Sequence, residues 1–304
     1  MHHVAQEKDH GVIRVGVAGW DYPDWRGTVY PSRPGGVFDR LAYLARFVDL
    51  VEINSTFYRP VDPRVASSWT RRTAHRNGFR FTAKAHRSWT HEAADPVSAV
   101  PLTLAGLEPL REAGRLGALL VQFPQSFHLG VASVARLDRL LDLLEGWPVV
   151  VEVRHASWDD AGFRERLRSR GAGLCAVDQP RVGRATLPPL AVVTAGVAYL
   201  RLHGRNGADW FREGAGRDAR YDYLYAEDEL RPLAAMAVEM SRGVREVFVV
   251  QNNHFRGKGL ANALMMKRLL GDERPDAPEE LCAAYPALRG IVEVRREGLF
   301  GTRG

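Results

Sequence analysis

Charged side chains interrupt the end of a strongly apolar segment. Residues 149–158 read VVVEVRHASW, so that Glu152 and Arg154 follow three consecutive valines and lie two residues apart. Side chains two residues apart in a strand point to the same face. Because buried charges cost free energy unless they are paired or used, this pair predicts either a structural ion pair or part of a binding site.

The same pattern recurs along the chain. The polar residues that end the other apolar runs are Glu52, Asn54, Lys84, Gln122, Asp178, Arg201, His203, Asn252 and Asn253. The alternate positions Val153, Val177 and Leu202 are apolar and are expected to face helices. Several charges in one cavity indicate a functional site. An ion-pair network that only fixes geometry is the alternative, although one buried pair contributes little net stability.

Eight strand-like runs alternate with amphipathic segments, which indicates parallel βαβ units. The runs are 12–19, 50–54, 79–84, 118–123, 149–154, 173–178, 198–203 and 247–252. The helical segments are 38–47, 62–76, 104–115, 134–144, 160–170, 228–242 and 260–271. Eight such units predict a single TIM-type (β/α)8 barrel with its site at the carboxyl ends of the strands. A doubly wound open sheet is the alternative, and the Pro- and Gly-interrupted segment 179–196 is the weakest unit.

Length and composition limit the class of protein. The 304 residues are 45% hydrophobic and 26% charged, with a net charge of +6. No apolar run is long enough to span a membrane, and the two cysteines form neither a disulfide framework nor a metal-type spacing, so a cytoplasmic protein is expected. We expect residues 1–11 to be a disordered polar tail and 12–304 to form one domain. The positive charge favours anionic partners but does not prove them.

Long motifs also resemble a known family over roughly residues 12–272. They are GVAGWDYPDWRGTVYP (16–31), VEINSTFYRPVDPRVASSWTRRT (51–73), FRFTAKAHRSWTH (79–91), VQFPQSFH (121–128), VEVRHASW (151–158), YLRLHGRN (199–206), YDYLY (221–225) and QNNHFRGKGLANAL (251–264). The chain is similar to the domain of unknown function 72 family, also called YecE-like. This resemblance implies a TIM-type barrel and no established reaction. Similar sequences often read GTSGW where this one reads GVAGW, so a mechanism that needs a serine hydroxyl beside Gly19 would not apply.

Four residues are candidate catalytic groups: Glu52, Lys84, Glu152 and Asp178. Lys84 would be a base or an electrostatic stabiliser, and the carboxylates would be general acids or bases. Arg154, Arg201 and His203 would hold an anion, because guanidinium groups bind carboxylate and phosphate in a bidentate manner. Histidines titrate near neutrality when unperturbed, and we expect the same of His203 and His254 in this site.

Aromatic and polar side chains after the strands complete the predicted ligand site. They are Trp20, Tyr22 and Tyr58, as stacking platforms, with Asn54, Gln122, Asn252 and Asn253. Other tryptophans also follow strand ends, where packing of loops is the alternative: Trp25, Trp89, Trp158 and Trp210. Arg256 lies with two glycines at the start of a helix, where barrels frequently hold phosphate, although a plain capped loop is the alternative. The long, glycine-rich loop 204–225 is typical of a lid.

Three functions follow. The favoured one is a hydrolase, lyase or isomerase that acts on a small anionic polar molecule, such as a sugar phosphate or a nucleotide-like molecule. The second is a metal-dependent hydrolase or phosphodiesterase with Glu52, Glu152, Asp178 and His203 as ligands. The third, not favoured, is a nucleic-acid-binding module, whose affinity would fall steeply with salt. Whether a cofactor takes part is left open.

Overall fold

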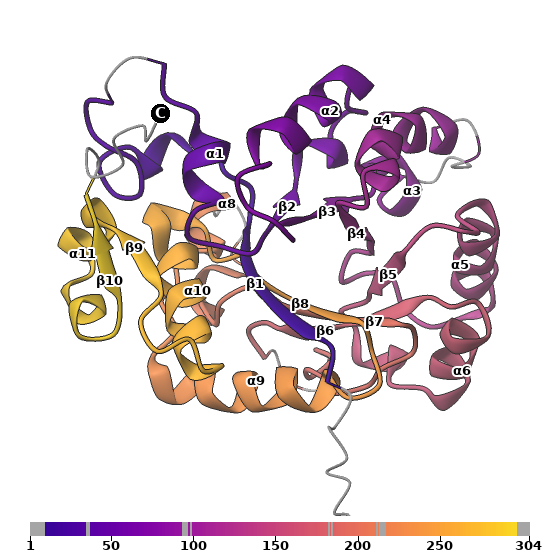
Figure 1. The fold of residues 1–304 in the computed structure, drawn as a ribbon. Coiled ribbons are helices and arrows are strands. Elements are labelled where there is room, and N and C mark those ends of the chain that lie inside the picture. The colour runs from indigo at the N-terminus through magenta and orange to yellow at the C-terminus, as the bar shows by residue number, and fades with distance from the viewer. Residues whose placement is uncertain are drawn as a thin grey trace, which may run out of the picture.

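Eight parallel strands close into a barrel in which neighbours in the chain are neighbours in the sheet (Figure 1). The computed structural model describes residues 10–34, 37–92, 97, 99–181, 183, 185–210, 212 and 217–296. The strands are β1 (Val12–Ala18), β2 (Leu50–Ile53), β3 (Arg80–Lys84), β4 (Leu116–Gln122), β5 (Val149–Glu152), β6 (Gly173–Asp178), β7 (Val197–Leu202) and β8 (Glu246–Gln251). β1 pairs with both β2 and β8, so the barrel is closed. The predicted TIM-type barrel is confirmed, and the open sheet is excluded.

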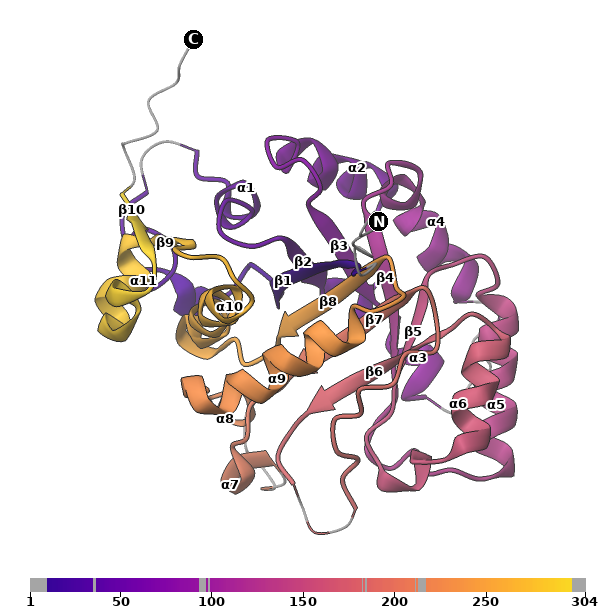
Figure 2. The ribbon, with the colours of Figure 1, turned by 60° about the horizontal axis from the view of Figure 1, so that its bottom comes forward.

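Helices cover the outside of the barrel (Figures 1 and 2). They are α1 (Arg40–Leu44), α2 (Pro63–Arg72), α3 (Arg87–Thr90), α4 (Val100–Glu112), α5 (Val131–Leu143), α6 (Ala161–Ser169), α7 (Gly207–Trp210), α8 (Arg217–Arg220), α9 (Glu227–Met240) and α10 (Lys258–Leu269). Asp39, Asp62 and Asp160 accept hydrogen bonds from the first turns of α1, α2 and α6, as N-cap residues do. The described residues between β6 and β7 form no helix, which agrees with the weak helical pattern there.

A small layer follows α10 and packs beside it (Figures 1 and 2). It contains β9 (Asp276–Pro278), α11 (Glu279–Ala284) and β10 (Glu293–Arg295), with the two strands paired in parallel. The Tyr285 hydroxyl donates to the carbonyl oxygen of Arg256 at 2.7 Å, which fastens the loop after β8. None of the described helices is both long and apolar enough to cross a membrane.

The predicted tail lies at the amino end of β1. Its residues 1–9 are outside the described residues. The Gly11 amide donates to the carbonyl oxygen of Ser241 at 2.8 Å, next to the start of β1.

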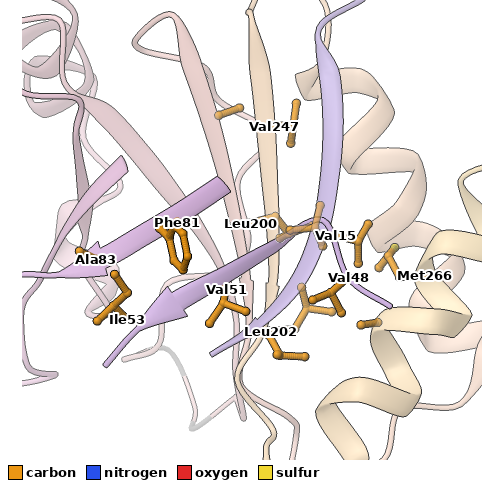
Figure 3. Packing of buried hydrophobic residues seen from close by; sticks show 14 of the residues in the cluster. Val15, Val48, Val51, Ile53, Phe81, Ala83, Leu200, Leu202, Val247 and Met266 are labelled. Atoms are coloured by element: carbon orange, nitrogen blue, oxygen red, sulfur yellow. The ribbon is translucent and has the colours of Figure 1, made fainter. Parts of the chain in front are cut away.

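The barrel wall separates two apolar cores. The inner core contains Ala18, Leu50, Ala118, Leu120, Val150, Cys175, Val177, Val197, Tyr199, Phe248 and Val250. The alternate strand positions pack outward against the helices, as Val51, Leu200 and Met266 show in Figure 3. Side chains alternate along a strand. A polar residue at a strand end therefore points into the mouth of the barrel when it lies an even number of positions from a residue of the inner core.

Glycine is required where β1 and β2 meet. Gly16 is paired with Leu50, and a Cβ atom on Gly16 would overlap the Leu50 carbonyl oxygen. The obstacle is backbone, so it cannot rotate away. By contrast, a Cβ on Gly290 would meet no atom within 4 Å.

Gly16→Ala is therefore expected to lower the free energy of unfolding by about 3 kcal/mol, the upper part of the range for overpacking. Urea denaturation followed by tryptophan fluorescence measures this change, with Gly290→Ala as the control that stays within about 1 kcal/mol of the parent. Equal stability of the two variants would contradict this expectation, because it would show that β1 and β2 move apart without a loss of folding free energy.

Candidate functional site at the carboxyl end of the barrel

Arg201 is the centre of a buried ionic network. It projects from β7 and is only 2% exposed. Its Nε and Nη2 atoms donate to the two carboxylate oxygens of Glu52 at 3.0 and 2.6 Å, and Nη1 donates to Glu152 at 3.1 Å. Its Nη2 also donates to the side-chain oxygen of Asn252 at 3.1 Å. One guanidinium group thus joins residues from β2, from β5 and from the loop after β8.

A second arginine completes the charge balance. Arg154 Nε donates to Glu152 at 2.9 Å, so both carboxylates are paired. Burial by itself raises the pKa of Glu152, but Arg201, Arg154 and the hydrogen bond from His203 outweigh burial and hold this pKa well below its usual range. Glu152 is therefore a permanent carboxylate. The prediction that it acts as a general acid has no support from this geometry.

His203 is held neutral within this network. Burial first, and then the Arg154 and Arg201 charges, lower the pKa of His203 to about 3. Its Nδ1 lies 2.9 Å from the Asn252 amide nitrogen, and its Nε2 lies 3.3 Å from Glu152. A neutral ring that accepts a hydrogen bond from Asn252 at Nδ1 carries its proton on Nε2. This N–H donates a hydrogen bond to Glu152. This environment does not favour the expected titration of His203 near neutrality, because the ring is buried and two guanidinium groups lie beside it.

Lys84 ends β3 beside this network but is not part of it. Its Nζ lies 3.9 Å from the centre of the Phe57 ring. Among the described residues, this amine has no hydrogen bond and no ion pair within 4.0 Å. Burial and the Arg201 charge lower the pKa of Lys84 to about 7, against the weaker opposite effects of Glu152 and Glu52. A substantial fraction of this amine is therefore uncharged near pH 7.

A cavity of about 250 Å³ opens above Lys84 and Arg201. Its wall consists of Gly19, Trp20, Asp21, Tyr22, Asn54, Ser55, Phe57, Tyr58, Lys84, Arg201, Tyr221, Asn252 and His254. The Tyr22 ring stacks on His254 with centroids 4.3 Å apart, and Tyr221 lies 5.2 Å from His254. The cavity therefore has a charged floor and largely aromatic sides, which suits a small polar molecule with a flat or apolar part.

Most of the predicted site residues meet here. The network contains Glu52, Glu152, Arg154, Arg201, His203 and Asn252, and the cavity wall adds Trp20, Tyr22, Asn54, Tyr58 and Lys84. His254, which was expected in the mouth, also lines the cavity, whereas sequence reasoning missed Phe57 and Tyr221 as wall residues. Phe57 and Tyr221 belong to motifs that the family resemblance covers. They were missed because the direction of their side chains depends on loop geometry, which the sequence pattern does not give.

Asp178 does not share this mouth. The inward residues of β6 are Cys175 and Val177, so Asp178 points to the helix side. Its carboxylate accepts from Arg205 Nη2 at 2.9 Å and from the Tyr225 hydroxyl at 2.6 Å. The predicted orientation of this strand was wrong, because both of its faces are apolar up to Asp178 and alternation gave no direction.

Three other predicted ligand residues do not line the cavity. Gln122 donates to the Phe123 carbonyl oxygen at 2.7 Å, and Asn253 donates to Asn262 of α10 at 2.8 Å. Arg256 is exposed, and its backbone amide donates to the Asp24 carboxylate at 2.6 Å. The Asp24 carboxylate thus accepts the hydrogen bond of the loop amide at the place where we expected a phosphate.

The predicted tryptophans also divide into residues that line the cavity and residues that pack the loops. Trp25, Trp89 and Trp158 are at most 1% exposed, so they pack the loops and are not stacking platforms. Trp20 lines the cavity, edge-on to Trp69 at 5.5 Å. The side chain of Trp210 is outside the described residues, as are residues 211 and 213–216 of the loop 204–225 that was expected to form a lid.

The predicted metal ligands do not fit a metal. Arg201 lies between Glu52 and Glu152, His203 donates to Glu152, and Asp178 faces the other side of the wall. Within the described ranges, no group of three or more His, Cys, Asp or Glu residues is arranged to hold a metal ion.

Comparisons with known proteins place the whole chain in one group. The family described as "Protein of unknown function DUF72" matches residues 14–299. The UPF0759 protein YunF of Bacillus subtilis is 27% identical over 285 residues, covering 89% of this chain and 99% of that protein. The UPF0759 protein YecE of Escherichia coli K12 is 31% identical over 166 residues, covering 53% and 55% of the two chains.

Solved structures agree with this result. A DUF72 family protein from Thermotoga maritima superposes with a TM-score of 0.75 at 34% identity, covering 86% of this chain and 100% of that one. A DUF72 family protein from Enterococcus faecalis gives 0.73 at 26% identity, covering 85% and 95%. The resemblance stated from the motifs is confirmed.

Arg201→Met is expected to destabilise the protein by about 3–5 kcal/mol, because it leaves Glu52 and Glu152 as buried carboxylates without their shared partner. Urea denaturation at pH 7 measures the loss. Arg231→Met is the matched control, since the Arg231 side chain is 67% exposed and, among the described residues, pairs with Glu227 alone, and such pairs contribute about 0–1 kcal/mol. A cost below about 1 kcal/mol for Arg201→Met would mean that the network is not a structural unit.

Proposed function

The chain belongs to the DUF72 family of proteins of unknown function, and we propose that the mouth of its barrel is an active site for a small anionic molecule. Lys84 is the reactive group of this site. The observation that carries the proposal is that Lys84 faces the cavity without a carboxylate partner among the described residues, while both nearby glutamates are paired with arginines.

Charge supports an anionic ligand. Glu52 and Glu152 balance Arg201 and Arg154, and His203 is neutral. Asp21, the carboxylate in the described wall, is paired with Arg40, so a protonated Lys84 gives the mouth a net positive charge. An anion beside it would restore the balance and would favour the charged form of the amine.

The hydrogen-bonding groups of the wall support a specific orientation. Arg201 and Asn252 reach the cavity and are fixed by contacts on their far sides. The Asn54 side-chain oxygen is buried and accepts no hydrogen bond from any described residue, so a hydroxyl or amide of a ligand would satisfy it. Prearranged groups of this kind lower the entropic cost of binding.

The chemistry that fits is proton transfer by Lys84. An amine with a pKa near the working pH accepts and returns protons efficiently. Glu52 and Glu152 then serve to position Arg201 and Arg154, in place of the acid–base role predicted for them. The substrate would be small, because the cavity is close to the lower end of the size of ligand pockets.

Thermal stabilisation by small anions tests this proposal. Ribose 5-phosphate, glycerol 3-phosphate, lactate and mononucleotides are added singly, and at least one is expected to raise the melting temperature. Lys84→Met should weaken that binding at least tenfold, about 1.4 kcal/mol, because the ligand loses its cationic partner.

Lys258→Met is the matched control, because Lys258 is paired with Asp222 away from the cavity. It should bind as the parent does. Equal binding by Lys84→Met would contradict the proposal. Stabilisation only by oligonucleotides, with a steep dependence on salt, would favour the nucleic-acid-binding alternative.

A further inference from the structure

We infer that Lys84 forms an imine with the carbonyl carbon of a small aldehyde or ketone that carries a carboxylate or phosphate group. This inference rests on the proposed function and names its substrate class. It is carried by the contrast between Lys84 and the other lysines of the chain.

Lysine is rare in this protein. The chain has 38 arginines but only four lysines: Lys8, Lys84, Lys258 and Lys267. Lys258 is paired with Asp222, and Lys267 lies 3.2 Å from Asp49 and 3.8 Å from Asp272. Of the lysines in the part of the chain that the structure describes, Lys84 alone has no carboxylate partner within 4.0 Å. Lys8 lies outside that part.

The surroundings of Lys84 act against its charge. Burial and the Arg201 and Arg154 charges lower the pKa to about 7, while the Phe57 ring is the group that faces the amine at 3.9 Å. Two carboxylates are close enough to influence Lys84, yet each is already held by arginine. A site meant only to hold an anion would keep its amine protonated. Arginine could not replace lysine here, since a guanidinium group does not lose its proton.

An uncharged amine facing a cavity is a nucleophile for carbonyl carbon. The Nζ lone pair forms a bond to that carbon as the carbonyl π electrons move to oxygen, and the ammonium proton is transferred to the oxygen. Loss of water then forms the C=N bond. Amine and carbonyl compound give imine and water, with no change in oxidation state. The protonated imine withdraws electrons from a neighbouring bond, which suits the lyase and isomerase classes.

The anionic group of the substrate has a partner in the same wall. Arg201 and Asn252 line the cavity together with Lys84. Both side chains remain in place when the amine is converted, because Glu52 and His203 hold them. Lys84 is thus available for the carbonyl carbon, while the guanidinium charge and the amide of the same wall attract the anion.

Reductive trapping tests this inference. The full chain is incubated separately with glyoxylate, pyruvate and dihydroxyacetone phosphate, then treated with sodium borohydride, and peptide mass spectrometry locates the adduct. We expect at least one compound to label Lys84 at least tenfold more than Lys258 or Lys267. Lys84→Arg should abolish this adduct, whereas Lys258→Arg should retain it. The melting temperature of each variant shows that it is folded.

No preferential labelling of Lys84 by any of the three compounds overturns the inference. Glycerol 3-phosphate and lactate, which have no aldehyde or ketone group, separate the two proposals. If either stabilises the protein and no adduct forms, the anion site stands and the imine is wrong. If none of the anions of the thermal screen stabilises the protein and no adduct forms, both proposals fail.

Discussion

The bidentate pairing of Arg201 with Glu52, extended to Glu152, is the constraint on which the mouth of the barrel depends. It joins three strands that are not adjacent in the sheet, because β2, β5 and β7 each contribute one member. A buried pair of this kind contributes little net stability compared with apolar packing. Its value is geometric, since it fixes the positions of donors that face the cavity.

The same pairing determines the chemistry of Lys84. A carboxylate with free oxygens beside an amine would keep that amine protonated. Here the arginines occupy the carboxylates, and their positive charges act with burial on Lys84. The result is an amine near its titration midpoint at neutral pH, in a cavity with anion-binding donors. Structural and chemical roles are thus divided between the glutamates and the lysine.

Much of this arrangement could be predicted from the sequence. All eight strand segments were found, because their apolar runs are short and are bounded by turn residues. The inward direction of Glu152 and Arg201 also followed from alternation. Asp178 was misplaced because Cys175, Ala176 and Val177 are all apolar, so no face of β6 was marked. The neutral state of His203 and the low pKa of Lys84 were not predicted, since both arise first from burial in the closed barrel and then from the charges of Arg201 and Arg154.

The central claim is that Lys84 is near its titration midpoint at neutral pH, and NMR titration of its side chain tests it most directly. Lysine labelled with ¹³C at Cε gives few signals in a chain with four lysines, and Lys84→Arg identifies the one that belongs to Lys84. The account predicts a midpoint at about pH 7 for this signal. A midpoint near the ordinary lysine value of about 10.4 would contradict it.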